Sequence, residues 1–184
     1  MRILLATGNA HKVAEVQEIL GPDHTVVAQD TGAEETGDTF EENALLKARA
    51  ACASAGMLAL ADDSGIEIDA LDGGPGVRSA RWTDEGDWIP RVLRELDGVP
   101  PAERTARFVS AAAAVWPDGR TVVRRGVVEG HVAAAARGAS GFGYDPVFVP
   151  VEGDGRTFGE MTADEKHAIS HRARAFRELV PLLS

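Results

Sequence analysis

Residues that could bind phosphate lie close to the N-terminus, where a glycine turn leads from an apolar run into a helical pattern. Residues 3–6 are apolar, and apolar residues recur at helical spacing between positions 13 and 20. A turn that enters a helix N-terminus presents backbone N–H groups and the positive end of the helix dipole, which together bind anions. An ordinary strand-to-helix connection has the same pattern. The candidate anion-binding residues are Thr7, Gly8, Asn9, Ala10, His11 and Lys12.

Acidic residues follow the apolar segment 58–61, which is a predicted buried strand. Asp62 and Asp63 come directly after it, and open α/β sheets bind ligands outside the carboxyl ends of their strands. Two adjacent aspartates point in different directions, so one could face a site while the other anchors the loop. Glu34 and Glu35 lie in a second loop that could converge on the same place. Such oxygen ligands beside phosphates favour Mg²⁺, whereas an Asx turn and a solvated acidic loop are the alternatives.

Two later segments could recognise a purine base. The glycine-rich turn 141–146 holds Phe142 and Tyr144, and a flat aromatic ring beside backbone amides can support a purine. A hairpin corner whose aromatics fill the core explains this turn equally well. On a helix, Lys166 and Ser170 would share a face. His171 and Arg172 would supply donors to a phosphate or a base carbonyl, although any amphipathic helix can carry such a basic stretch.

The elements that must position these residues alternate along the chain. Strands are predicted at residues 25–28, 106–115 and 121–128, with the turn 117–119 between the last two. Strand character is also expected for the alanine-rich stretches 111–114 and 133–136. Helices are predicted after the capping box that begins at Thr39, over residues 87–96 with Pro90 in the first turn, and from about Thr162. The pattern indicates a mixed sheet with helices packed on it.

Composition limits the classes of protein to which the chain can belong. Its 184 residues suit one domain, or two lobes that share a core. A net charge of −10 argues against non-specific binding to nucleic acid, which requires a basic face. No apolar run is long enough to span a membrane, and the N-terminus does not have the pattern of a signal peptide. With the single cysteine Cys52, expected to be a buried apolar residue, these features predict a cytoplasmic protein that binds neither nucleic acid nor membrane.

Five motifs occur in an order that resembles one known family over essentially the whole chain, the inosine triphosphate pyrophosphatases. They are Thr7-Gly8-Asn9-x-x-Lys12, Glu35-Thr36-Gly37-x-Thr39-Phe40-x-Glu42-Asn43-Ala44, Asp62-Asp63-Ser64-Gly65, Phe142-Gly143-Tyr144-Asp145-Pro146 and Ser170-His171-Arg172. Each motif alone is weak, but five in order are specific. The resemblance implies an elongated α/β fold with a mixed β-sheet, flanking helices and two lobes around a central substrate cleft. It also implies a homodimer, with residues 1–184 forming a single pyrophosphatase domain.

The resemblance further implies a role for individual residues. Asp63 matches the catalytic proton acceptor and an Mg²⁺ ligand, and Glu34 matches a second metal ligand. Phe142 would stack on the base, while His171 and Arg172 would read the 6-oxo group of a non-standard purine nucleoside triphosphate (ITP, dITP or XTP) and reject adenine. The residues that match substrate-binding positions are Thr7, Gly8, Asn9, Ala10, His11, Lys12, Ser64, Phe142, Gly143, Tyr144, Asp145, Lys166, His171 and Arg172.

One segment departs from the family pattern, and two other functions compete with the predicted one. The segment 82–90 is shorter than in the family and carries two tryptophans, which affects the expected loop and the dimer contact rather than the catalytic set. The nearer alternative is a pyrophosphatase of the septum-associated type that acts on pyrimidine nucleotides. The other is a non-catalytic module that senses purine nucleotides. The motif 170–172 and the Phe142 turn favour a purine, and intact Asp63 and Glu34 favour catalysis.

Overall fold

The computed structural model describes residues 1–83 and 86–183, and its strands form one six-stranded mixed sheet in the order β2-β1-β3-β4-β5-β6. β1 pairs in parallel with β2 and β3, whereas β5 pairs antiparallel with β6. Asp84 and Glu85, in the segment that departs from the family pattern, lie outside the described residues. The strands are β1 (Arg2–Leu5), β2 (Thr25–Ala28), β3 (Ala59–Ile68), β4 (Thr105–Val115), β5 (Thr121–Val132) and β6 (Phe148–Pro150). The predicted mixed sheet with flanking helices is confirmed.

Local signals explain where the helices begin and end. The Asn9 side chain caps α1, and the predicted capping box between Thr39 and Glu42 is present at the start of α2. Pro90 lies in the first turn of α3, where its missing N–H costs no helical hydrogen bond. The helices are α1 (Ala10–Leu20), α2 (Phe40–Ala55), α3 (Trp88–Glu95), α4 (Ala163–Ile169) and α5 (His171–Leu179).

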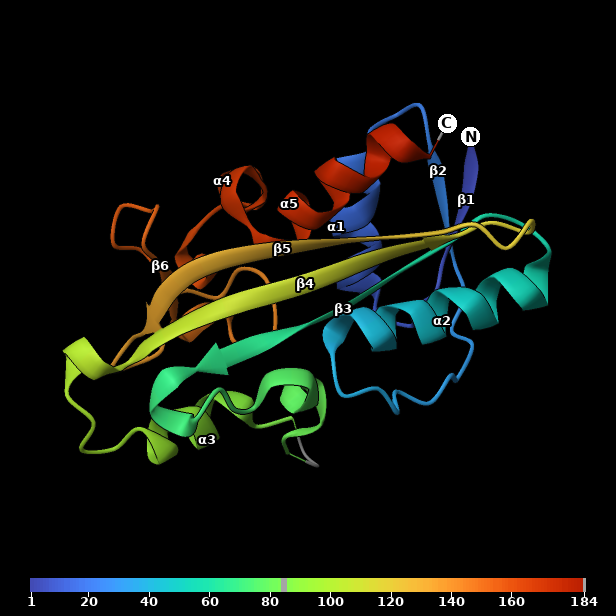
Figure 1. The fold of residues 1–184 in the computed structure, drawn as a ribbon. Coiled ribbons are helices and arrows are strands. Elements are labelled where there is room, and N and C mark those ends of the chain that lie inside the picture. Colours follow the sequence, from blue (N-terminus) through green and yellow to red (C-terminus); the bar gives the residue numbers. More distant parts are fainter. Residues whose placement is uncertain (84–85, 184) are drawn as a thin grey trace. The chain divides into compact units, whose positions relative to one another are not determined.

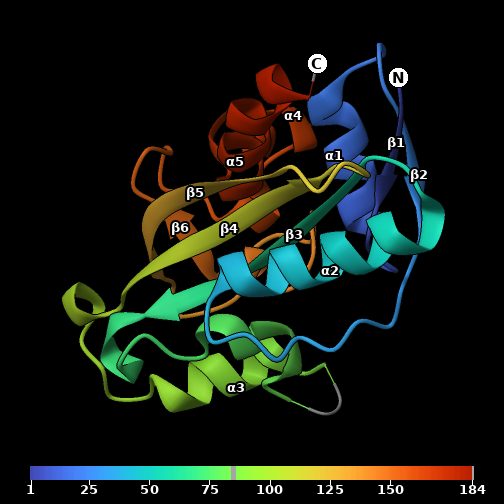
Figure 2. The same ribbon diagram turned by 45° about the vertical axis from the view of Figure 1, so that its right-hand side comes forward.

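The chain divides into two compact units. The first contains Met1–Ser64, Ser110–Gly126 and His171–Ser184. Within it, α1 and α5 pack against each other on one face of the strands, and α2 covers the opposite face (Figures 1 and 2). Its main core cluster is largely aliphatic and includes Leu5, Leu60 and Phe176. The strand residues of this unit are thus covered by helices on both faces.

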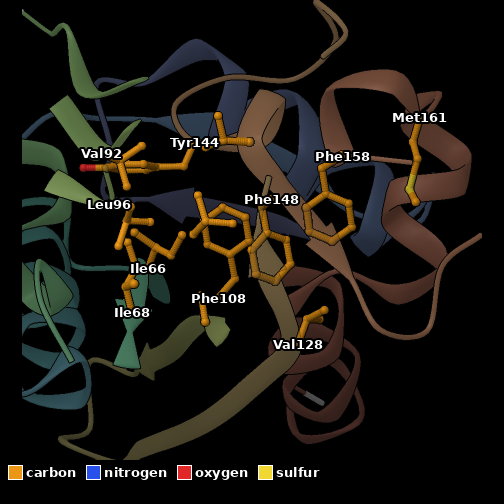
Figure 3. Packing of buried hydrophobic residues seen from close by; sticks show 13 residues of the cluster. Ile66, Ile68, Val92, Leu96, Phe108, Val128, Tyr144, Phe148, Phe158 and Met161 are labelled. Atoms are coloured by element: carbon orange, nitrogen blue, oxygen red, sulfur yellow. The ribbon is translucent and has the colours of Figure 1, made fainter. Parts of the chain in front are cut away.

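The second unit contains Gly65–Val109 and Val127–Ser170. Three phenylalanines stand at the centre of its core (Figure 3). The ring centroid of Phe108 lies 4.4 Å from that of Phe148 and 5.9 Å from that of Phe158. Ile66, Ile68, Val92 and Leu96 belong to the same cluster.

The structure corrects the predicted end of the strand at residues 58–61. This strand continues through the acidic residues as β3, so that Asp62, Asp63 and Ser64 lie inside it and not in a loop after it. Successive side chains of a strand point to opposite faces of the sheet. Asp62 and Ser64 therefore share one face, and Asp63 points to the other. The prediction that the two aspartates point in different directions is confirmed, but strand geometry is the reason.

Of two further predictions about secondary structure, one is incomplete and one is wrong. The helix expected from Thr162 is interrupted at Ser170, whose backbone is extended and whose N–H closes α4 on the Lys166 carbonyl at 2.8 Å. The stretch 133–136 is not a strand, since β5 ends at Val132, where its pairing with β6 also ends. The stretch 111–114 does lie in β4, as predicted. Among the described residues, no helix has the length and apolarity that a membrane crossing requires.

Candidate active site

The predicted phosphate turn has the expected order of strand, turn and helix. The Thr7 hydroxyl accepts a hydrogen bond from the Asn9 N–H at 3.1 Å, and the Asn9 side chain accepts from the N–H groups of His11 and Lys12 at 2.9 and 3.4 Å. Two first-turn donors that the sequence led us to expect free for an anion are therefore bonded to Asn9. A Cβ at Gly8 would lie 2.8 Å from Oδ2 of the exposed Asp30, whose side chain would have to move aside.

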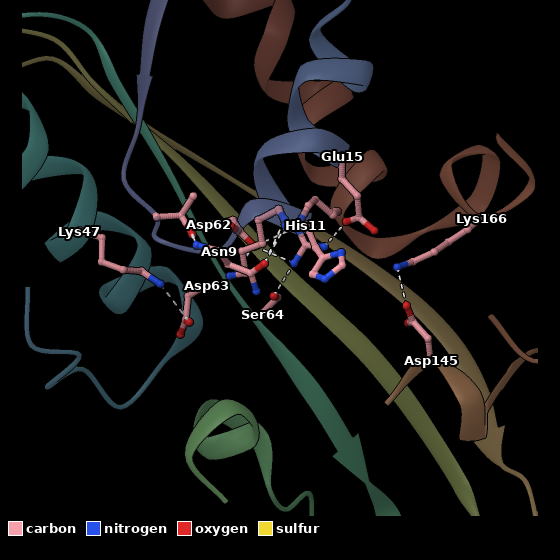
Figure 4. A network of polar contacts seen from close by, with 12 residues as sticks. Asn9, His11, Glu15, Lys47, Asp62, Asp63, Ser64, Asp145 and Lys166 are labelled. Atoms are coloured by element: carbon pink, nitrogen blue, oxygen red, sulfur yellow. Dashed lines mark hydrogen bonds and ion pairs between the residues drawn. The ribbon is translucent and has the colours of Figure 1, made fainter. Parts of the chain in front are cut away.

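Asp62 lies at the centre of a buried ionic cluster in the first unit (Figure 4). Its Oδ2 is 3.2 Å from Lys12 Nζ and accepts hydrogen bonds from Nε and Nη2 of Arg172, both at 3.1 Å. Arg172 Nη2 also donates to Ser64 Oγ at 2.8 Å, and Arg172 Nη1 donates to Glu15. The cluster brings together three predicted site residues: Lys12 from α1, Ser64 from β3 and Arg172 from α5.

Burial and neighbouring charges act in opposite directions on Asp62. Burial favours its neutral form, but the positive charges of Lys12 and Arg172 outweigh this and hold the pKa of the carboxyl well below its ordinary value. Burial lowers the pKa of the Lys12 ammonium; Asp62 opposes that shift and Arg172 adds to it. Within the described chain, Asp62 Oδ1 is a buried oxygen with no hydrogen-bond partner. Asp62 is thus held in its ionised form, and its Oδ1 accepts no hydrogen bond from the described residues.

Asp63 is held by two residues of α2 on the other face of β3. Asn43 Nδ2 donates to Asp63 Oδ2 at 3.2 Å, and Lys47 Nζ lies 3.3 Å from Asp63 Oδ1 (Figure 4). The same ammonium lies 2.6 Å from Glu35 Oε1. Burial raises the pKa of the Asp63 carboxyl; Lys47 opposes this rise and Glu35 adds to it. The two neighbouring aspartates therefore have pKa values shifted in opposite directions, an arrangement typical of paired catalytic carboxylates.

The sequence interpretation gave no role to Asn43, Lys47 or Glu15. Asn43 is fully buried, and its Oδ1 also accepts the Gly37 N–H at 2.8 Å, so it connects the loop before α2 to Asp63. Asn43 and Lys47 stand four residues apart on α2 and share a face. An asparagine and a lysine at this spacing, in the helix that follows a capping box, were the signal available in the sequence. The sequence did not show that Asp63 is their common partner, so this signal could not be assigned to a site.

The donors around Asp63 suit a hard divalent cation. Mg²⁺ is commonly held by one or two carboxylates together with substrate phosphates, and Asp63 and Glu35 already enclose a cation, the Lys47 ammonium. Glu34, the predicted second metal ligand, is exposed in the same loop as Glu35. Among the residues described, no three His, Cys, Asp or Glu side chains gather closely enough to hold a metal by themselves. The residues fit an ion that the substrate helps to bind.

The predicted base-binding turn lies in the second unit. Phe142 is half-buried, and its N–H donates to Asp145 Oδ2 at 2.9 Å. The same oxygen accepts from Lys166 Nζ at 2.7 Å (Figure 4). This ammonium lies 5.0 Å from the centre of the Phe142 ring. The Tyr144 hydroxyl donates to the Ser79 carbonyl at 2.7 Å, which directs this ring into the core. The turn thus presents one aromatic ring, Phe142, and buries the other.

The motif 170–172 divides between the two units. Ser170 ends α4 in the second unit, whereas His171 and Arg172 begin α5 in the first. Both residues of α5 are buried, and Arg172 is 1% exposed. Since its guanidinium is bonded to Asp62, Glu15 and Ser64, Arg172 also positions other residues of the site. That His171 and Arg172 read the 6-oxo group stays a prediction.

Comparison with known proteins supports the resemblance seen in the motifs. The model of the Ham1 family matches residues 3–182. A dITP/XTP pyrophosphatase of Symbiobacterium thermophilum is 52% identical over 180 residues, which cover 95% of this chain and 90% of that protein. A dITP/XTP pyrophosphatase of Agrobacterium fabrum is 45% identical over 201 residues, covering 97% of this chain and 94% of that protein.

Solved structures show the same fold. A HAM1 protein from Coxiella burnetii superposes with a TM-score of 0.86 at 39% identity, covering 100% of this chain and 98% of that one. A nucleoside-triphosphatase / dITP/XTP pyrophosphatase from Mycobacterium abscessus superposes with a TM-score of 0.76 at 42% identity, covering 100% and 99%. Fold and sequence are therefore similar over the full length of the chain.

Proposed function

Because the chain belongs to the Ham1 family, we propose that it hydrolyses non-standard purine nucleoside triphosphates (ITP, dITP and XTP) to the monophosphate and pyrophosphate. Its curated relatives bear the name dITP/XTP pyrophosphatase. The observation that carries the proposal is the pair Asp62 and Asp63. One carboxylate is held ionised among cations, and the other has a raised pKa and contacts two residues of one helix. Such an enzyme would remove these nucleotides before polymerases use them.

Asp63 is the proposed proton acceptor. A water molecule attacks the α-phosphorus, the bond between this phosphorus and the bridging oxygen breaks, and pyrophosphate leaves while the proton of the water passes to Asp63. Asn43 and Lys47 hold the carboxylate from both of its oxygens, so that its orientation is set before substrate binds. Positioning and electrostatic stabilisation then supply most of the rate enhancement, since no covalent intermediate is needed.

The cations of the first unit would stabilise the charge of the triphosphate. Lys12 stands at the start of α1, where the helix dipole is also positive. Its ammonium is held 3.2 Å from Asp62 and is thereby fixed in place. A phosphate that approaches Lys12 would compete with Asp62 for it, and Arg172 would keep Asp62 neutralised during that exchange. Asp62 therefore serves as an anchor for the cations.

Mg²⁺ is the proposed cofactor. Asp63 and Glu34 would hold it; Glu35, in the same loop, is already bonded to Lys47. When bound, Mg²⁺ lowers the pKa of a coordinated water and offsets the charge of the phosphates. Phe142 is the proposed stacking partner of the purine, and His171 and Arg172 are the proposed donors to its 6-oxo group. The homodimer, the cytoplasmic location and the central substrate cleft stay predictions.

A nucleotide panel tests the proposed function. ITP, dITP, XTP, GTP, ATP and UTP are each incubated with the protein and Mg²⁺, and pyrophosphate and orthophosphate are measured separately. We expect pyrophosphate from ITP, dITP and XTP. Preference for UTP would favour the septum-associated alternative. Orthophosphate as the sole product would place the cleavage at another bond, and binding without any product would indicate a nucleotide sensor.

A further inference from the structure

Gly141 stands directly beside the carboxylate that organises the base-binding turn. A Cβ at this position would lie 2.0 Å from Asp145 Oδ2, 2.9 Å from its Cγ and 3.3 Å from its Cβ. A side-chain end normally moves aside at little cost. Here the clashing oxygen is the one bonded to both the Phe142 N–H and Lys166 Nζ, so a methyl group would displace it from both donors.

The contacts that Gly141 permits are buried and charge-assisted. Asp145 is 3% exposed and Lys166 is 4% exposed, and hydrogen bonds between ionised groups are roughly twice as strong as neutral ones. Because Asp145 Oδ2 bonds to the backbone of Phe142, it fixes the turn on which the Phe142 ring stands. Lys166 Nζ, held by the same oxygen, faces that ring at 5.0 Å, within the range of a cation–π contact.

We propose that Gly141 is a positioning residue for base recognition, because the absence of a side chain there lets Asp145 hold Phe142 and Lys166 in the geometry that receives the purine. The inference rests on the proposed function, since it concerns the base-binding end of that same site. Gly141 itself contacts no substrate in this account. Its effect passes through Asp145, and removal of Asp145 should abolish it.

The second unit contains a matched control outside the proposed site. Gly141 has a φ of +71° and Gly155 a φ of +90°, so alanine at either position takes on left-handed strain. A Cβ at Gly155 would meet no atom within 4 Å, unlike one at Gly141. The difference between Gly141→Ala and Gly155→Ala therefore separates the clash with Asp145 from the cost of the backbone conformation.

Steady-state kinetics with ITP are the first test. Stacking of a base on an aromatic side chain contributes enough affinity that its loss should raise KM by a factor on the order of 10 in Gly141→Ala relative to Gly155→Ala. The kcat of the two variants should agree within about twofold. Inhibition by inorganic tripolyphosphate, which has no base, should not differ between them. Equal KM values in the two variants, or tripolyphosphate binding that weakens in parallel with ITP binding, would overturn the proposal.

Urea unfolding is the second test and does not depend on activity. Gly141→Ala should lower the midpoint more than Gly155→Ala does, and the difference should vanish when both are made in an Asp145→Ala background. A difference that persists there overturns the proposal; if Asp145→Ala does not fold, the comparison in the wild-type background decides. A protein that releases no pyrophosphate from any purine nucleotide would refute the proposed function, and the unfolding experiment would still decide whether Gly141 acts through Asp145.

Discussion

Asp62 and Asp63 are neighbours in β3, yet their carboxylates bond to helices on opposite faces of the sheet. Asp62 contacts Lys12 and Arg172, and Asp63 contacts Asn43 and Lys47. This follows from the alternation of side chains along a strand. Two identical residues thereby have different environments and opposite pKa shifts, which supports the assignment of one as anchor and the other as proton acceptor.

Asp63→Asn tests whether Asp63 is the proton acceptor. The substitution keeps the size of the side chain and removes the charge that accepts a proton and binds metal. We expect turnover of ITP to fall at least about 100-fold, because general bases typically contribute 10²–10⁴-fold, while nucleotide binding persists. Binding is measured by calorimetry and turnover by pyrophosphate release. Residual activity above about a tenth of wild type would exclude the role of Asp63 as a base.

Substitutions at Glu34 and Glu35 can show which of these two adjacent carboxylates is the second Mg²⁺ ligand. Chelation should abolish pyrophosphate release, and added Mg²⁺ should restore it. Because Glu35 is bonded to Lys47 and Glu34 is exposed, Glu34→Gln should raise the Mg²⁺ concentration for half-maximal activity by roughly tenfold or more. Glu35→Gln is the matched control, with a smaller expected rise. The reverse order would make Glu35 the ligand, and full activity in chelator would refute metal dependence.

Selectivity for a 6-oxo purine is expected to depend on His171. An unpaired buried donor costs on the order of 1–3 kcal/mol. If ATP leaves both His171 and Arg172 unpaired, kcat/KM for ITP should exceed that for ATP by roughly a hundredfold. His171→Ala should reduce turnover of ITP far more than that of ATP and so lower this ratio. Equal losses for the two nucleotides would show that His171 serves phosphate binding or folding instead. His171 is the better residue to test, because the loss of Arg172 would also disturb Asp62.

Arg172 is expected to be a major contributor to stability. It is 1% exposed, and its removal leaves Asp62 and Glu15 with one cation fewer in a buried site. Breaking a buried ion pair from one side is strongly destabilising, so Arg172→Ala should lower the free energy of unfolding by about 3 kcal/mol. The exposed Arg49 of α2 is the control, with an expected change within about 0.5 kcal/mol. Comparable losses in both variants would contradict this role.

Because Tyr144 is buried, we expect the free energy of unfolding to depend on pH in the alkaline range. Burial raises the pKa of its hydroxyl, although Arg91 opposes the rise. The folded state therefore holds this proton more tightly than the unfolded state does, and stability falls as the pH rises above the ordinary value of about 10. Tyr144→Phe should cost about 1 kcal/mol near pH 7, where the bond to Ser79 is lost. The deficit should shrink by about pH 11 in urea unfolding; a constant deficit would refute the linkage.

The sequence by itself determined most of the helices and strands, and the family. Caps such as Asn9 and the Thr39 box act within a few residues, and periodic apolar positions define helices and strands, so these features could be predicted locally. Five motifs in order were enough to identify the family. The end of β3 could not be predicted in this way, since an acidic run usually ends a strand. It continues here because cations from α1, α2 and α5 neutralise the aspartates.

Only the tertiary structure decided which charges meet. Arg172 is 110 residues from Asp62 along the chain, and Lys47 is 16 residues from Asp63. A buried charge must be paired or neutralised, but spacing does not say by which partner. Packing makes that choice: α5 places Arg172 on the Asp62 face of β3, and α2 places Asn43 and Lys47 on the Asp63 face. Likewise, the proposed role of Gly141, which is to leave space for the Asp145 carboxylate, could be inferred only from the structure.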